Sequence, residues 1–157
     1  FQDRSRFMIA LVQRVSTASV DVDGETVGAI DAGLLILLGV HQDDGEAEAE
    51  GLASKCARLR VFPDADGRMD TSLIDTGHRA LVVPQFTLCG DTTQGNRPSF
   101  TEAAPPKRAE RLYEHFVLLL SRELNAPVPT GVFGAAMDVH LTNDGPVTFW
   151  VERAAND

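Results

Sequence analysis

The sequence contains little cysteine, and none in a spacing typical of a zinc site or a disulfide framework. Only Cys56 and Cys89 occur in 157 residues, and one disulfide would be little framework for a chain of this length. Two scattered thiols without a secretion signal are typical of the reducing cytoplasm. Cysteine is also among the residue types most often buried. We therefore expect a cytoplasmic protein in which both cysteines serve packing.

Positive charge is also scarce. The chain has 14 Lys and Arg residues against 23 Asp and Glu, which gives a net charge of −9, and it has no basic run. Contacts along a nucleic-acid backbone require clustered Lys and Arg. The composition thus excludes a broad backbone-binding surface, and any nucleic-acid partner has to be held at few phosphates or by one terminus.

Long apolar runs are missing as well. The longest, Leu34–Leu38, has the length of a strand, whereas a helix that crosses a bilayer needs roughly 20 apolar residues. Residues 1–7 lack the apolar core and cleavage site of a signal peptide, and we interpret them as a remnant of expression cloning. Residues 8–153 are expected to form a single domain without a membrane segment.

Many strand-like runs and only two helical runs predict an α+β fold, with a largely antiparallel or mixed sheet or a barrel-like core. Apolar residues recur at helical spacing over 46–60 and again after Pro105–Pro106, a pair that suits a first helical turn. Strands are expected over residues 9–15, 19–23, 26–30, 34–40, 80–83 with 85–88 beyond Pro84, 132–142 and 147–151.

Motifs for metal, nucleotide and covalent chemistry do not occur. The four histidines are dispersed and share no ligand spacing with another His, Cys or carboxylate. No nucleophile elbow, phosphate loop or dinucleotide fingerprint is present. The turn at 64–67 resembles part of a calcium loop but lacks its final Glu. We expect no metal and no cofactor, which leaves polar residues beside irregular backbone as candidates for a site.

Two prolines interrupt strand-like runs. Pro84 precedes Thr87, and Gly145–Pro146 separates the runs 137–142 and 147–151. Proline cannot donate a ladder hydrogen bond, so it belongs at a strand end, an edge or a turn. Taken locally, the second pair predicts a hairpin turn. Thr87 alone is typical of a structural strand residue, and without a nearby base it is a poor nucleophile.

Longer matches point to one family. The segment 84–88, PQFTL, resembles the Ser-Gln-Phe-Thr-Leu signature of the D-aminoacyl-tRNA deacylases, also called D-tyrosyl-tRNA(Tyr) deacylases. The segment 143–148, NDGPVT, is similar to the second signature of that family, which contains its Gly-cisPro pair. Further matches follow in family order at 13–15, 33–40, 95–100 and 131–137. Pro84 departs from the family Ser and lacks its hydroxyl and one backbone N–H. Asp70 stands where Asn is expected.

This resemblance implies a homodimer that hydrolyses the ester between a D-amino acid and the terminal ribose of tRNA, a chiral proofreading step in translation. Whether glycyl-tRNA is also hydrolysed stays open. In the family, the Gly-Pro pair of one subunit enters the pocket of the other and excludes L side chains with its backbone. The implied site residues are Gln85, Phe86 and Thr87 for catalysis, Gly145, Pro146 and Arg14 for chirality and substrate binding, and Met69, Phe86 and Phe100 for the adenosine pocket.

Two versions of the chemistry stay open. Either Thr87 is the nucleophile, or the 2′-hydroxyl of the RNA assists while backbone N–H groups at Phe86 and Thr87 hold the oxyanion. The second is favoured because no base is evident beside Thr87 in the sequence. Two other function classes also remain, a generic acyl-ester hydrolase and a non-catalytic dimeric module that binds adenosine or tRNA. Turnover of model esters alone indicates the first, and tight binding without turnover indicates the second.

Overall fold

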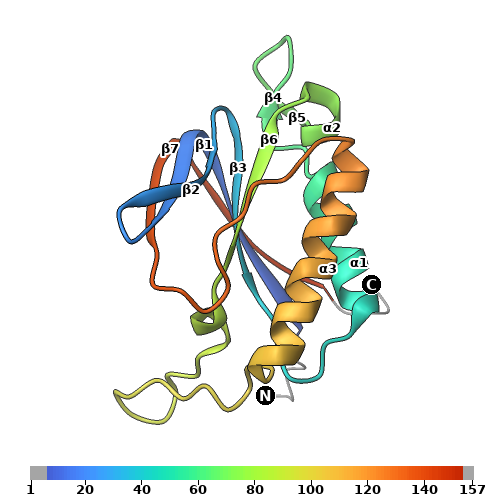
Figure 1. Ribbon diagram of the computed structural model, residues 1–157. Helices are drawn as coiled ribbons and strands as arrows, with labels where there is room; N and C mark the ends of the chain where they lie inside the picture. The colour runs from blue at the N-terminus through green and yellow to red at the C-terminus, as the bar shows by residue number, and fades with distance from the viewer. Residues whose placement is uncertain (1–6, 154–157) are drawn as a thin grey trace.

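The computed structural model describes residues 7–153 (Figure 1). Apart from Phe7, the expected expression remnant lies outside the described residues, so the proposed boundaries 1–7 and 8–153 stay predictions. A curled mixed sheet and three α-helices form an α+β fold, which confirms the predicted class. Within residues 7–153 no helix combines the length and the apolar character needed to cross a membrane.

A five-stranded sheet carries the fold. Its main path runs β2-β1-β3-β6, and β7 also pairs with β1. Every pairing in it is antiparallel except that of β3 with β6. The strands are β1 (Met8–Val22), β2 (Glu25–Ile30), β3 (Gly33–Gly39), β6 (Arg79–Pro84) and β7 (Asp138–Arg153), and a separate ribbon contains β4 (Phe62–Pro63) and β5 (Met69–Thr71).

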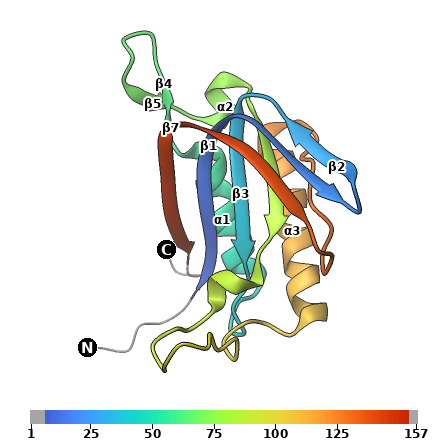
Figure 2. The same cartoon turned by 90° about the vertical axis from the view of Figure 1, so that its left-hand side faces the viewer.

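The long strand β1 organises the sheet. The sequence predicts two strands over 9–15 and 19–23, whereas β1 continues across both ranges. Its first half pairs with β3, its second half pairs with β2, and β7 accompanies both halves. Figure 2 shows β7 along one side of β1, with α1 and α3 behind the sheet. Since β7 pairs with β1 alone, it forms an edge of the described sheet.

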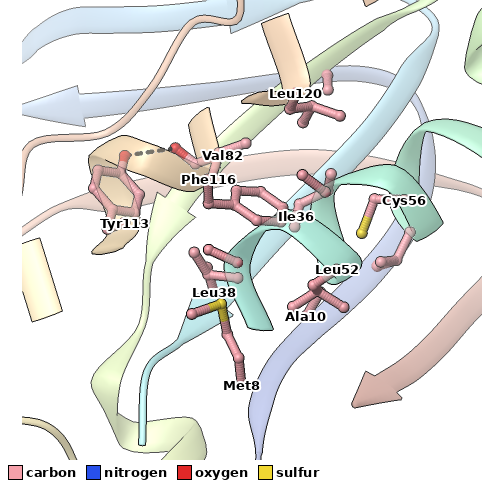
Figure 3. Packing of buried hydrophobic residues seen from close by; sticks show 14 of the residues in the cluster. Met8, Ala10, Ile36, Leu38, Leu52, Cys56, Val82, Tyr113, Phe116 and Leu120 are labelled. Carbon is pink, nitrogen blue, oxygen red and sulfur yellow. Dashed lines mark hydrogen bonds between the residues drawn. The ribbon is translucent and has the colours of Figure 1, made fainter. Parts of the chain in front are cut away.

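Two long helices, α1 (Glu46–Arg58) and α3 (Pro106–Leu124), cover one face of the sheet. The Glu48 carboxylate accepts a hydrogen bond from the Gly45 N–H at 2.5 Å and so closes the start of α1. Asn125 ends α3 in the left-handed conformation. Figure 3 shows the resulting core, in which helix residues meet strand residues: Leu52, Cys56, Tyr113, Phe116, Leu120, Met8, Ala10, Ile36, Leu38 and Val82.

Two predicted strand segments have other structures. Residues 86–89 form a 3-10 helix, η1 (Phe86–Cys89). The Gln85 N–H still donates to the Leu38 carbonyl of β3 at 2.8 Å, and after this bond the chain leaves the sheet. Residues 132–137 form a turn and irregular backbone instead of a strand. A four-residue helix, α2 (Leu73–Thr76), follows β5. Both cysteines are buried, as expected for packing residues.

Candidate active site

The junction between β6 and η1 presents backbone donors to solvent. The first N–H groups of a helix have no acceptor within that helix. Gln85 supplies no side-chain cap, and the N–H groups of Phe86 and Thr87 have no acceptor among the described residues. The side chains of Phe86 and Thr87 are exposed. Two adjacent donors of this kind can stabilise a developing oxyanion.

An apolar cavity of about 780 Å³ lies beside these donors. Its walls come from the ends of β3 and β6, residues 100–109 and residues 133–139, and Gln85 and Phe86 lie at its η1 side. Phe86 and Phe100 meet edge to face with 5.1 Å between ring centroids. Phe86 is 57% exposed and Phe100 is 39% exposed. Aromatic surface of this kind suits the stacking of an unpaired base.

No ordinary general base lines this cavity. Among the described residues that form its walls there is no carboxylate, imidazole, amine or thiol, and Tyr113 is the titratable group. Burial raises the pKa of Tyr113 to about 12, and its hydroxyl donates to the Val82 carbonyl at 3.2 Å (Figure 3). Tyr113 therefore keeps its proton at neutral pH and cannot serve as the base.

Thr87 stands outside the cavity walls, and its hydroxyl is engaged by Gln85. The Gln85 side-chain amide donates to Thr87 Oγ1. An amide donor cannot accept the hydroxyl proton, so this contact orients Thr87 without activating it as a nucleophile. Of the predicted catalytic residues, Gln85 and Phe86 line the cavity, and Thr87 lies next to it in η1.

The Gly145–Pro146 pair lies in a bulge of β7 and not in a hairpin turn. Both flanks of the pair continue along the same neighbour, since Thr148 pairs with Gln13 and Asn143 pairs with Val15 of β1. Residues 144–147, here called the β7 bulge, therefore loop out opposite a single β1 residue. The hairpin interpretation is wrong because it pairs the two flanks with each other. The Gly145–Pro146 peptide is cis, and both residues are exposed.

The side chain of Asn143 closes the base of the β7 bulge. Its Oδ1 accepts from the Val147 N–H at 2.8 Å, and its Nδ2 donates to Thr148 Oγ1 at 2.8 Å. Gly145 has φ +143°, a conformation that L side chains rarely adopt. A Cβ at this position would lie 2.6 Å from Val147 Cγ2. The bulge thus depends on glycine at 145 and on the asparagine amide.

Arg14 holds the same bulge from the β1 side. Its Nε donates to the Asp144 carbonyl at 3.0 Å, and its Nη1 donates to the Val61 carbonyl at 2.7 Å. The Asp144 carboxylate lies 3.4 Å from Nε, and the Arg14 side chain is only 13% exposed. A fork of donors that reaches two carbonyls at once is a property of arginine and not of lysine. Arg14 is thus a brace within its own chain.

The predicted site residues fall into two groups at opposite ends of the sheet. Arg14 pairs with Leu34 of β3, whereas Pro84, which leads into η1, pairs with Leu38. Four strand positions separate these levels by roughly 13 Å along the strands, and the three strand spacings from β7, which carries the bulge, to β6 add roughly 14 Å across the sheet. Figure 1 shows β4 and β5 at the upper end and the yellow-green turn of η1 at the lower end. We call these the bulge end and the η1 end.

Met69 belongs to the bulge end. It pairs with Pro63 in the small ribbon next to Val61, the residue that Arg14 contacts, and it is 48% exposed. It does not line the cavity that contains Phe86 and Phe100. Within one chain, therefore, the three residues of the predicted adenosine pocket do not come together.

Comparison with known proteins identifies the family to which this chain belongs. The family profile described as D-Tyr-tRNA(Tyr) deacylase matches residues 11–152, from within β1 to within β7. The chain belongs to this family. It is 71% identical over 150 residues to the D-aminoacyl-tRNA deacylase of Salinibacter ruber, across 96% of this chain and 100% of that one. It is 55% identical over 145 residues to the D-aminoacyl-tRNA deacylase of Ruegeria pomeroyi, across 92% and 99% of the two chains.

A solved structure named c-Myc DNA Unwinding Element Binding Protein is also similar to this chain. It superposes with a TM-score of 0.86 at 41% identity and covers 93% of this chain and 99% of its own. The DNA binding in that name belongs to that protein. The similarity supports the deacylase fold over nearly the whole length of the present chain.

Several cavity residues were missed by sequence reasoning about this deacylase-family chain. They come from three separate segments that only the fold brings together, and they are Leu38, Val40, Pro105, Tyr113, Phe133 and Met137. One signal was present, because residues 131–137 match a family segment. That segment was interpreted as the start of a strand, which hid its role as a cavity wall.

One cluster of possible metal ligands exists in residues 7–153, although sequence spacing predicted none. Glu46 and Glu50 of α1 and His115 of α3 place their ligand atoms within 4.8 Å of one another. His115 Nε2 lies 3.4 Å from Glu50 Oε2, so the imidazole already has a hydrogen-bond partner within the protein. The cluster is on the helical layer and does not line the cavity.

Proposed function

We propose that this chain hydrolyses the ester of D-aminoacyl-tRNA and releases the free D-amino acid and tRNA. Membership of the deacylase family supports the reaction. The observation that carries the mechanism is the pair of unpaired N–H groups at Phe86 and Thr87 beside an apolar cavity. A substrate gripped at its 3′ end suits a chain with a net charge of −9, because few phosphates need to be contacted.

The two N–H groups stabilise the charge that develops on the ester carbonyl oxygen. Water forms a bond to the carbonyl carbon and loses a proton, the bond from that carbon to the ribose oxygen breaks, and the ribose oxygen takes up the proton that the water lost. The 2′-hydroxyl of the terminal ribose relays this proton, since no carboxylate or imidazole lines the described cavity. Positioning and a prearranged oxyanion site suffice for an ester that is already labile.

The terminal adenosine occupies the cavity next to Phe86 and Phe100. Their edge-to-face pair leaves ring surface open for a base. Met69 contributes to the same pocket only when a second copy of the chain supplies it, because its own chain holds it at the bulge end.

A second copy of the chain also supplies the chirality filter. In this arrangement the exposed β7 bulge of one copy enters the cavity mouth of the other, and its backbone fills the space that an L side chain needs. The edge strand β7 exposes Leu141, Phe149 and Trp150, the last of them 52% exposed. Large apolar side chains on an edge strand suit a symmetric contact between two copies. The tRNA substrate and the scarcity of cysteine, with only two scattered residues, fit a cytoplasmic location.

The direct test compares D-tyrosyl-tRNA with L-tyrosyl-tRNA as substrates. We expect rapid release of the D-amino acid, little release of the L-amino acid, and full activity after exhaustive chelation. Hydrolysis of model esters without any D-aminoacyl-tRNA turnover indicates a generic esterase. Tight binding of tRNA without turnover indicates a binding module. Either outcome contradicts the proposal.

Thr87→Ala separates the two catalytic versions. The variant keeps the backbone N–H at 87 and loses the hydroxyl that Gln85 engages, so we expect kcat within about threefold of wild type. A substrate whose terminal ribose lacks the 2′-hydroxyl should be hydrolysed very slowly by both proteins. If Thr87→Ala is inactive and an acyl ester on Thr87 is trapped on wild type, Thr87 is the nucleophile.

A further inference from the structure

A short parallel bridge joins β6 to the segment after α3. Val82 pairs with Thr130, the Val82 N–H donates to the Pro129 carbonyl at 3.1 Å, and the Gly131 N–H donates to the Val82 carbonyl at 2.9 Å. The Val82 carbonyl also accepts from the Tyr113 hydroxyl (Figure 3). The segment that precedes the cavity wall is therefore firmly held at Val82.

The next rung of this ladder is missing at Pro84. In a parallel ladder, every second residue of a strand bonds to the neighbouring strand through both its N–H and its carbonyl. Val82 makes these two bonds, so the next bond of the ladder would join the N–H of residue 84 to the Gly131 carbonyl. Proline has no N–H, and the bridge stops after one residue pair. Beyond Gly131 the chain leaves the sheet and forms a turn, in which the Ala135 N–H donates to the Val132 carbonyl at 3.2 Å.

The segment released in this way becomes one wall of the cavity. Phe133, Met137 and Pro84 all line it. The contact at Gly131 is tight, since a Cβ there would lie 2.7 Å from Met137 Sδ and 3.4 Å from Pro84 Cδ. The proline ring thus lies close to Gly131.

We propose that Pro84 is a positioning residue that sets the width of the cavity by keeping residues 131–137 off the β6 ladder. This proposal rests on the proposed function, because it assigns the open cavity to the terminal adenosine of the substrate. Pro84 itself takes no part in the chemistry. Its effect is on substrate binding, through the distance between η1 and the 131–137 wall.

The test is Pro84→Ala, which restores an N–H at residue 84. We expect this N–H to donate to the Gly131 carbonyl, to be protected from hydrogen exchange, and to draw the wall toward β6. The narrower cavity should raise KM for D-tyrosyl-tRNA about threefold to tenfold, the scale of one net hydrogen bond. The value of kcat should stay within about twofold. Pro127→Ala is the control, because this exposed proline lies in the same connection and does not line the cavity.

Two results overturn the proposal. One is rapid hydrogen exchange at the restored N–H of residue 84 together with unchanged KM. The other is a fall in kcat at constant KM, which assigns Pro84 to the oxyanion donors instead of the wall. If wild type does not hydrolyse D-tyrosyl-tRNA, the proposed function fails, and the exchange measurement still decides whether residue 84 controls the ladder.

Discussion

The η1 end and the bulge end of the sheet differ in what they offer to a substrate. The η1 end has an apolar cavity and two backbone donors, and no charged side chain lines that cavity in the described chain. The bulge end has exposed backbone at Gly145–Pro146, fixed from behind by Arg14 and Asn143. One end can bind and polarise an ester, and the other can only present a rigid shape. Neither end contains all the predicted site residues, so the comparison favours a site assembled from two copies.

The largest effect is expected from a change in the shape of the bulge end. Gly145→Ala introduces a Cβ at φ +143° and within 2.8 Å of the Val147 N–H nitrogen, so the bulge has to shift. We expect kcat/KM for D-tyrosyl-tRNA to fall by about a hundredfold, the scale of a 1 Å displacement at a site. Gly24→Ala is the matched control, since Gly24 also has positive φ but has open space around it. Equal losses in both variants would mean that general instability, and not the bulge shape, lowers the activity.

A smaller effect is expected when the bulge loses its brace. Arg14→Ala removes the bonds to the Asp144 and Val61 carbonyls and leaves the η1 end unchanged. The loss of a hydrogen bond that fixes the bulge should lower kcat/KM about tenfold. Arg60→Ala is the control, because Arg60 is an exposed arginine of the same end that is paired with Asp70. Steady-state kinetics of both variants measure this effect. Unchanged activity of Arg14→Ala would mean that the brace is not needed for activity.

The smallest effect on activity is expected from Asp44, which supports the η1 end from beneath. Its buried carboxylate accepts from the Met8 N–H at 3.0 Å and from the His41 N–H at 2.7 Å. Burial raises the pKa of Asp44 to about 7, and the nearby Glu48 carboxylate adds to the rise. The two backbone hydrogen bonds and Arg108 lower the pKa, but their effect is smaller than that of burial. The folded state thus binds a proton that the unfolded chain releases above its ordinary value of 3.8.

This pKa shift has a defined sign. The stability that Asp44 contributes is fully present below about pH 4 and is lost as the pH rises through about 7. Asp44→Asn should therefore flatten the dependence of Tm on pH between 4 and 7 while kcat stays near the wild-type value. Melting curves at several pH values measure this directly. A wild-type Tm that rises steadily from pH 4 to 7, with the slope reduced by Asp44→Asn, would contradict the predicted sign.

The parts of the fold with local periodicity were predictable from the sequence. The 46–60 and Pro105 runs repeat apolar residues at helical spacing, and both form helices close to those bounds. The two predicted strands in 9–23 merge into β1, because strand pairing continues across their boundary. Local periodicity predicts the type of an element, and pairing with distant strands sets its length.

The bulge and the cavity were not predictable from local patterns. The Gly145–Pro146 pair has the composition of a hairpin turn, and only the pairing of both flanks with β1, more than 120 positions away in the chain, makes it a bulge. The strand predicted beyond Pro84 fails because the sheet pairing ends once the Gln85 N–H has donated to the Leu38 carbonyl, and the chain then coils into η1. The family signatures marked both segments as site candidates, because a signature does not depend on the periodicity of the chain.

In the proposed dimer, each site combines the η1 end of one copy with the bulge end of the other. Mixing two strongly impaired variants tests this arrangement, Gly145→Ala at the bulge end and Phe86→Pro at the η1 end. Proline suits the first position of a helix and removes one oxyanion donor there. Random exchange of subunits makes half of the dimers mixed, and one of the two sites in each mixed dimer has both intact ends. We predict that co-refolding the two variants restores about one quarter of wild-type turnover, and a mixture no more active than its parents would contradict the shared site.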